Sequence, residues 1–260
     1  MGLVGATLSA VLCPVVCLGV PAGPTPAALS AAEASMSAIR RAEAYYQSRE
    51  DVNNLREAIG ILQRHVAADA QDYGAWWRIA KYDCYLARRL PDKQKKSIVE
   101  QGVTAGQKAE HLQPARPEGH YWTGVDEGLL AEARGLFGGL ALIDSVRNEM
   151  EAVLKIDPDY LEDGAERVLG RLYYLAPFFK GGNNQHSVQV LEHCLKLYPE
   201  NSLTMLYLAD SYRAVGRIND ARRMLDGILH LSPSPEYGPE LAENQTIARR
   251  ELAKYFHASL

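Results

Sequence analysis

The chain has 260 residues, of which 47% are hydrophobic and 23% are charged, and its formal net charge is −4. This balance is ordinary for a globular domain. It argues against a disordered chain and against a membrane protein with several spans. Because the overall charge is negative, no basic field attracts nucleic acid, and we expect no nucleic-acid partner.

Residues 1–32 carry no charged side chain. Within them, an apolar run over residues 3–20 is interrupted by Pro14 and followed by a segment rich in proline and alanine. This order is typical of a secretory signal peptide and a linker, although the usual preceding cation is missing. A retained anchor and an untargeted tail are the alternatives. We expect an exported, periplasmic protein that is either free or membrane-associated through this segment; the residues before Cys13 and Cys17 match a lipoprotein signal poorly.

The rest of the chain, residues 33–260, reads as helical repeats. In the clearest unit, residues 202–233, an apolar stripe at helical spacing precedes a turn at Gly216, a second stripe and a closing Pro233. The two stripes consist of Met205, Leu208, Ala209 and Tyr212, and of Ala221, Leu225 and Ile228. Two helices with a glycine turn and a terminal proline, repeated at about 34 residues, are typical of the tetratricopeptide repeat.

The closing proline recurs upstream, at spacings of 44, 41 and 34 residues between Pro114, Pro158, Pro199 and Pro233. The longer spacings predict insertions in the turns of the earlier units, at residues 135–139 and 176–184. An earlier helix pair begins with residues 33–47. The sequence therefore predicts one all-α domain, a right-handed solenoid of about five helix pairs.

A final helix over residues 241–256 is expected to cap the stack, which brings the total to about eleven helices. Its polar side chains, including Glu243 and Asn244, are expected to face solvent.

Two stretches resemble a bacterial family, the T-component proteins of TRAP transporters (TatT). One is GHYWTG at residues 119–124, followed by an insert and EAVLKIDPDY; the other is ERVLGRLYYLAPFFKGGN at residues 166–183, leading into VLEHCLKLYPEN. The resemblance implies a helical, exported and commonly lipidated scaffold that trimerises and partners a periplasmic solute-binding protein. Its implied role is to assist the uptake of small, often anionic, organic solutes.

A third stretch, residues 77–114, is similar to the regulators of microtubule dynamics, which are eukaryotic helical-repeat proteins of the same general plan. The secretory-looking N-terminus favours the bacterial family. We therefore expect a non-enzymatic binding or scaffold protein that serves a TRAP-type uptake system. The alternative is a generic adaptor for a protein or peptide ligand, including a role like that of the microtubule-dynamics regulators.

No motif in the sequence demands an enzyme, because the common nucleotide, hydrolase and zinc-protease signatures are absent. No two of the seven histidines lie four residues apart on one helix face, so we expect no metal site. We likewise expect no catalytic residue and no cofactor; an enzyme with an unrecognised site is the third hypothesis. Cys84 and Cys194 are expected to be buried apolar residues rather than a disulfide.

The repeat register predicts a binding groove, because the first helix of each tetratricopeptide pair lines the concave side. The small residues Ala80, Gly124, Gly170 and Ala209 set the register. The predicted groove residues are Trp77, Lys81, Tyr85, Tyr121, Arg167, Arg171, Tyr174, Asp210 and Arg213. The alternative for this set is packing between helices and salt bridges with Glu162, Asp163 or Glu166.

Arg167 and Arg171 lie four residues apart, so they share one helix face. Because both can hold a carboxylate through two hydrogen bonds, we expect an anionic ligand or an acidic partner segment there. The inserted turns at residues 136–140 and 177–182 carry Leu, Phe and Pro, and exposed apolar clusters often mark interfaces. They predict a homo-oligomer, with a trimer suggested by the family resemblance.

Overall fold

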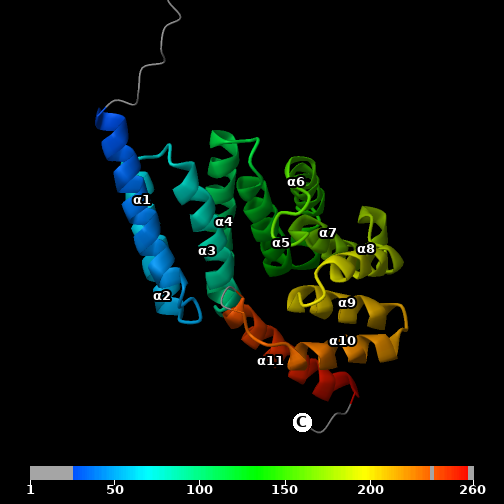
Figure 1. The fold of residues 1–260 in the computed structure, drawn as a ribbon. Helices are drawn as coiled ribbons and strands as arrows, with labels where there is room; N and C mark the ends of the chain where they lie inside the picture. Colours follow the sequence, from blue (N-terminus) through cyan, green and yellow to red (C-terminus); the bar gives the residue numbers. More distant parts are fainter. Residues whose placement is uncertain (1–25, 235–236, 257–260) are drawn as a thin grey trace, which may run out of the picture.

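The computed structural model describes residues 26–234 and 237–256 (Figure 1). These residues form eleven α-helices and one short 3₁₀-helix, with no strand among them, so the predicted all-α fold is confirmed. The helices are α1 Pro26–Tyr46, α2 Val52–Ala68, α3 Tyr73–Arg88, α4 Asp92–Leu112, α5 Pro117–Gly139, α6 Ile143–Ile156, α7 Gly164–Leu175, η1 Phe178–Lys180, α8 Asn184–Leu197, α9 Ser202–Ala214, α10 Ile218–His230 and α11 Gly238–Phe256.

Local sequence signals account for where the helices begin and end. Asp51, Asp72, Asn183 and Asn201 each precede a helix, and the side chain of each accepts a hydrogen bond from a backbone amide in the first turn. Gly216 adopts a positive φ of 79° in the turn between α9 and α10, as the sequence predicts. The four closing prolines each follow the end of α4, α6, α8 or α10 by two or three residues.

Two predicted boundaries are wrong. Helix α1 begins at Pro26 rather than at residue 33, because proline is favoured at a first helical position and the residues after it are rich in alanine. The segment 135–139, predicted as a turn, is instead the last part of α5, where a left-handed Gly135 (φ 69°) breaks the helical path without ending it. Residues 1–25, with most of the predicted signal peptide, lie outside the described residues.

Consecutive helices pack against each other in chain order, which gives five stacked pairs followed by α11. Small residues allow the pairs to approach closely. A Cβ at Gly124 would lie 2.4 Å from Met150 of α6, and one at Gly170 would lie 2.7 Å from Leu191 of α8. Ala209 and Ala221 are buried between α9 and α10, as expected from the repeat. Cys84 and Cys194 are buried free thiols.

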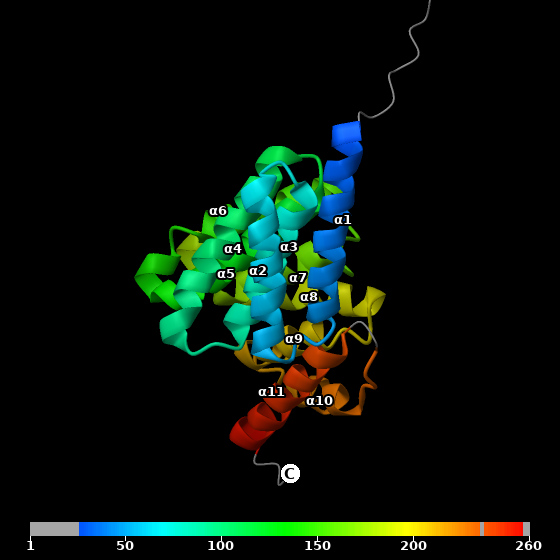
Figure 2. The same cartoon turned by 90° about the vertical axis from the view of Figure 1, so that its left-hand side faces the viewer.

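The stack curves strongly, so that α11 reaches back from α10 toward the ends of α1 and α3 (Figures 1 and 2). There Arg49, in the turn after α1, pairs with Glu240 of α11, and Arg89 at the end of α3 pairs with Glu243. The last helix therefore joins the two ends of the solenoid across its concave side. Within the described ranges, no helix combines the length and the apolar character needed to cross a membrane.

Candidate functional site

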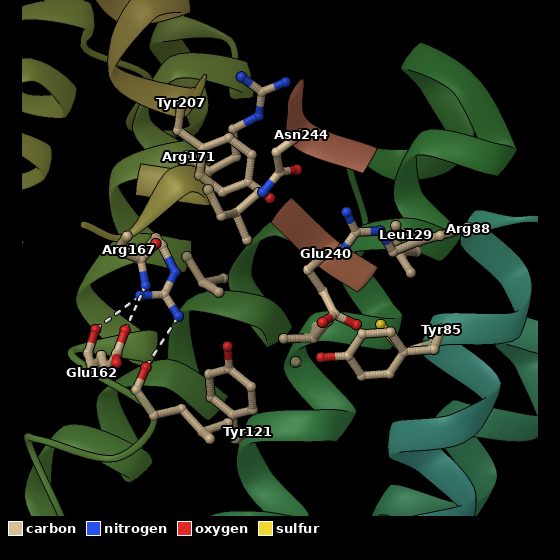
Figure 3. A pocket seen from close by; sticks show the side chains of 18 of the residues that line it. Tyr85, Arg88, Tyr121, Leu129, Glu162, Arg167, Arg171, Tyr207, Glu240 and Asn244 are labelled. Carbon is tan, nitrogen blue, oxygen red and sulfur yellow. Dashed lines mark hydrogen bonds between the residues drawn. The ribbon is translucent and has the colours of Figure 1, made fainter. Parts of the chain in front are cut away.

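A cavity of about 1540 Å³ occupies the concave side of the solenoid (Figure 3). Most of its wall comes from the first helices of the pairs, α1, α3, α5, α7 and α9, and α11 closes one side. This is the side on which the repeat register places the groove. Ligand pockets usually measure about 300–1,000 Å³, so this space is large enough for an extended ligand.

The structure brings five of the nine predicted groove residues to this cavity. They are Lys81, Tyr85, Tyr121, Arg167 and Arg171. The other four, Trp77, Tyr174, Asp210 and Arg213, do not line it. A role in binding stays a prediction for all nine.

The four outlying side chains are engaged with other parts of the protein. Trp77 lies under the guanidinium of Arg78, whose Cζ is 4.1 Å from the ring centroid. Asp210 accepts hydrogen bonds from Arg171 at 2.7 Å and from Arg213 at 3.3 Å. Arg213 also stacks on Tyr255 of α11, 3.4 Å from its ring centroid. Here the alternative of packing and salt bridges describes the geometry better than an open groove.

Arg167 supports a backbone turn instead of facing an open groove. Its side chain is buried, and its two Nη atoms donate to the carbonyl oxygens of Glu162 and Leu161 at 2.8 and 3.1 Å (Figure 3). Leu161, Glu162 and Asp163 all have positive φ between 52° and 56°, a conformation that non-glycine residues adopt at a cost. The two hydrogen bonds hold this left-handed segment at the cavity wall.

Arg171 lies four residues further along α7, in a more open position. Its guanidinium is 4.9 Å from the ring centroid of Tyr174 and 4.7 Å from that of Tyr207, and it donates to Asp210 at 2.7 Å. The pair Arg167 and Arg171 therefore does not form the single anion clamp that their spacing predicts. Arg167 donates hydrogen bonds to backbone carbonyl groups, and Arg171 donates one to the carboxylate of Asp210.

Lys81 is a cavity cation whose contacts among the described residues are to aromatic rings and not to a carboxylate. Its Nζ lies 4.6 Å from the ring centroid of Tyr46 and 5.9 Å from that of Trp122, and within the described residues it forms no ion pair with a carboxylate. Burial lowers the pKa of Lys81, because the ammonium loses water and only partly regains stabilisation from Glu43. An anion bound beside it would restore that stabilisation.

The sequence did not reveal the contribution of α11. Its polar face was expected to be solvated, but Asn244 and Glu240 are buried at the cavity wall, and Glu243 pairs with Arg88 and Arg89. The prediction of a solvated face for Glu243 and Asn244 is therefore wrong. No local pattern could have shown the ion pairs, because the partners of Glu240 and Glu243 lie more than 150 residues earlier in the chain.

Apolar side chains fill the spaces between the polar groups of the cavity wall. Leu129 and Val125 of α5, Leu172 of α7, Leu203 of α9 and Leu241 of α11 all line it. The cations Arg49, Lys81, Arg88, Arg167 and Arg171 are matched in number by the acids Glu43, Glu132, Glu162, Glu200 and Glu240. Arg49 and Glu240 neutralise each other. The cavity therefore has no single overall charge, and its charged groups act at separate places on the wall.

Comparisons with solved structures support the solenoid. TTC0263, a thermophilic TPR protein of Thermus thermophilus, aligns with a TM-score of 0.60 at 16% identity, over 84% of this chain and 98% of that one. PilW, a type IV pilus biogenesis factor, aligns with a TM-score of 0.56 at 16% identity, over 86% of this chain and 94% of that one. At such low identity these likenesses show the fold alone.

A search of curated proteins finds no match to this chain. A family model, described as regulator of microtubule dynamics protein 1-3, matches residues 38–176, which is more than half of the chain. The match includes the stretch 77–114 that resembles this family, whereas membership of the TatT family is not confirmed. The preference for the bacterial family is therefore not supported, and the chain belongs to the regulator of microtubule dynamics protein 1-3 family.

Proposed function

We propose that this protein is a non-enzymatic adaptor that binds an acidic segment of a partner protein in its concave cavity. The observation that carries this proposal is Lys81, a half-buried ammonium in the cavity wall without a carboxylate partner among the described residues. Apolar side chains of α5, α7 and α11 in the same cavity wall would accept apolar residues of the same segment. The tetratricopeptide-like fold supports the proposal, because the concave faces of helical solenoids are extended binding surfaces.

The first test is the replacement of Lys81 by Met, which keeps the apolar stem and removes the charge. We expect a fluorescent peptide of alternating Glu and Leu to bind the wild-type chain, and the variant to bind it about tenfold more weakly. A charge-assisted hydrogen bond contributes about 1.5 kcal/mol, which corresponds to that factor. Fluorescence anisotropy gives the affinities. The matched control is Lys108→Met, at an exposed lysine of α4 that lies away from the cavity.

Arg171→Ala provides a second variant at the same wall. We expect it also to weaken peptide binding, with a small loss of thermal stability, because its side chain is partly exposed and its ion pair with Asp210 is not deeply buried. Unchanged affinity in both Lys81→Met and Arg171→Ala, with normal folding, would exclude an acidic ligand at this wall. Failure of the Glu-Leu peptide to bind the wild-type chain would also exclude an acidic ligand at this wall.

A role in an uptake system remains a narrower form of the proposal. In that form Lys81 would receive the carboxylate of a small organic anion, and the partner would be a periplasmic solute-binding protein. Its support is the resemblance of residues 119–124 and 166–183 to TatT. The role also requires export, so N-terminal sequencing of the mature protein tests it. An intact Met1 in the cytosol, or the absence of a solute-binding protein after capture from the native envelope, would exclude it.

A role in microtubule dynamics is the second candidate function, and the family match over residues 38–176 favours it. The direct experiment is co-sedimentation of the purified chain with polymerised tubulin, with growth rates of single microtubules as a second measurement. Binding that Lys81→Met weakens would join this role to the cavity. Binding that the variant leaves unchanged would place the microtubule contact on another surface.

We further propose that the chain self-associates through the loop that contains η1. Phe178 and Phe179 in this loop are 92% and 74% exposed, which is unusual for adjacent aromatic residues. The other predicted loop, residues 136–140, includes two side chains outside the described set.

We expect Phe178→Ser/Phe179→Ser to convert an oligomer into a monomer of about 29 kDa by light scattering. Met36→Ser, at an exposed methionine of α1, is the control. A monomeric wild-type chain at tens of micromolar would refute self-association.

A further inference from the structure

A second group of polar side chains lies between α4, α5 and α6, and none of its members lines the concave cavity. Glu110 comes from the end of α4, His120 from the start of α5, and Glu149 from α6. One ligand atom of each, a carboxylate oxygen or an imidazole nitrogen, lies within 4.8 Å of the other two. Three helices that are sequential neighbours therefore bring together two carboxylates and an imidazole.

The hydrogen bonds of His120 orient its ring toward the carboxylates. Its Nε2 lies 3.0 Å from the carbonyl oxygen of Pro114, an atom that can only accept, so Nε2 carries a proton. Its Nδ1 lies 2.7 Å from Oε2 of Glu149. Histidines that bind metals usually donate their second N–H to a carbonyl or carboxylate in this way, which directs the other nitrogen at the ion.

A buried carboxylate beside the cluster has one oxygen without a hydrogen-bond partner among the described residues. Glu127 is 4% exposed; one of its oxygens accepts from Ser145 at 2.9 Å, and the other has no partner among the described residues. Thr123, also on α5, is 1% exposed. His120, Thr123 and Glu127 are spaced by three and four residues on α5, so they share the face that is turned toward this cluster.

Carboxyl groups outnumber cationic groups in this region. Three carboxyl groups face one imidazole, and the His120 ring is the only cationic group that the described residues supply within hydrogen-bond distance of Glu149. A divalent ion would neutralise two of the carboxylates at once.

We infer that Glu110, His120 and Glu149 form a binding site for a divalent first-row transition-metal ion such as Zn²⁺ or Mn²⁺. An imidazole nitrogen with carboxylate oxygens is a donor set that suits these ions, whereas Ca²⁺ and Mg²⁺ prefer oxygen ligands alone. Glu127 is outside this group of three ligand atoms, and its free oxygen would be available to a water bound to the ion. The ion would link α4, α5 and α6, and this site is independent of the function proposed for the concave cavity.

The site can be tested on the full-length, untagged chain after treatment with a chelator. We expect isothermal titration with Zn²⁺ to show saturable binding at one ion per chain. We also expect the melting temperature to rise by about 5 °C or more at a hundredfold excess of ion over Kd. Co²⁺ should give visible absorption bands that report nitrogen and oxygen ligands. Mg²⁺ and Ca²⁺ should produce neither effect at the same concentration.

Two variants locate the site. We expect His120→Gln and Glu149→Gln each to weaken Zn²⁺ binding at least tenfold, with circular dichroism to check folding. Glu151→Gln, at an exposed carboxylate on the same helix as Glu149, should leave binding unchanged. Glu166→Gln, from a second group formed by Asp163, Glu166 and Cys194, should also leave it unchanged. The inference is overturned if the wild-type chain shows no saturable binding below about 100 μM, or if only Glu166→Gln reduces it.

Discussion

Replacing Asp126 by Asn is expected to raise the melting temperature at neutral pH and to flatten the dependence of stability on pH. Asp126 of α5 and Asp83 of α3 are both 0% exposed, and none of their four carboxyl oxygens has a hydrogen-bond partner among the described residues. Burial raises the pKa of both carboxyls well above the usual range, and the charge of Asp83 raises that of Asp126 further. The folded chain therefore favours the protonated forms of both groups.

The direction of the pH effect follows from proton linkage. An aspartate in the unfolded chain has a pKa of about 3.9, so at pH 6 the folded chain binds more protons than the unfolded chain. The free energy of unfolding is therefore not reduced by these carboxyls below about pH 4. It falls as the pH rises from there toward their folded pKa values, because the unfolded chain releases the protons that the folded chain still holds. Each carboxyl can contribute a slope of up to about 1.4 kcal/mol per pH unit.

Asparagine removes this titration and preserves the shape of the side chain. Shape matters here, because α4 passes close by: a Cβ on Gly102 would lie 2.3 Å from Oδ2 of Asp126. We expect Asp126→Asn to melt about 5 °C higher than the wild-type chain at pH 8, with a smaller difference at pH 5. Melting temperatures measured from pH 5 to pH 8 give both quantities. Asp83→Asn should behave similarly, and the double variant should be the least sensitive to pH.

Glu57→Gln, at an exposed carboxylate of α2, provides the control and should leave the pH profile unchanged. One result would contradict the argument directly. If Asp126→Asn melted several degrees below the wild-type chain at every pH, the carboxylate would be ionised and held by a cation in the folded state. Burial without a partner would then be the wrong description of this pair.

Removing Glu240 is expected to destabilise the chain and to release α11. Arg49 and Glu240 form two parallel hydrogen bonds, from Nε to Oε1 at 2.7 Å and from Nη2 to Oε2 at 2.6 Å. Their side chains are only 4% and 12% exposed. The pair joins positions 191 residues apart, the turn after α1 and the start of α11.

We expect Glu240→Ala to lower the free energy of unfolding by about 3 kcal/mol, because a buried guanidinium loses its carboxylate. For a chain of this size the melting temperature should fall by about 6–12 °C. Amide hydrogen exchange should accelerate in residues 238–256 more than in α3 or α5, because the pair attaches α11 to the N-terminal end of the solenoid. Calorimetry and exchange measured by mass spectrometry provide the two readouts.

Glu243→Ala is the matched control, since Glu243 also joins α11 to α3 through Arg88 and Arg89, but with a more exposed carboxylate. Its effect should be smaller, on the order of 1 kcal/mol. The alternative result is a Glu240→Ala chain that melts lower yet shows unchanged exchange in α11. The salt bridge would then stabilise the turn after α1 rather than the closure of the solenoid.

The sequence determined the repeat architecture because its signals are local. Gly216 marked the turn inside the last pair and Pro233 marked its end, and the small residues Gly170 and Ala209 marked where helices meet. Each of these features acts within about one repeat, so periodicity and turn chemistry were enough to predict eleven helices. The same local reasoning placed Lys81, Tyr85 and Tyr121 on the concave side.

Local reasoning failed where a glycine-rich segment could either end a helix or interrupt it. Segment 135–139 was expected to form a turn, but it belongs to α5, in which Gly135 has non-helical dihedral angles. Likewise, the four-residue spacing of Arg167 and Arg171 predicted a joint anion site. Spacing predicts which helix face a side chain lies on, but not which groups lie opposite that face. In this structure the Arg167 guanidinium donates to carbonyl groups of the left-handed segment 161–163.

Only the tertiary structure decided the closure of the cavity by α11 and the clusters between non-adjacent residues. The Arg49–Glu240 pair, the Asp83–Asp126 pair and the group formed by Glu110, His120 and Glu149 belong to no repeat position. Their formation depends on the curvature of the solenoid and on the angles between its helices. The repeat length varies from 34 to 44 residues along this chain, so its period fixes the order of the helices but not that curvature.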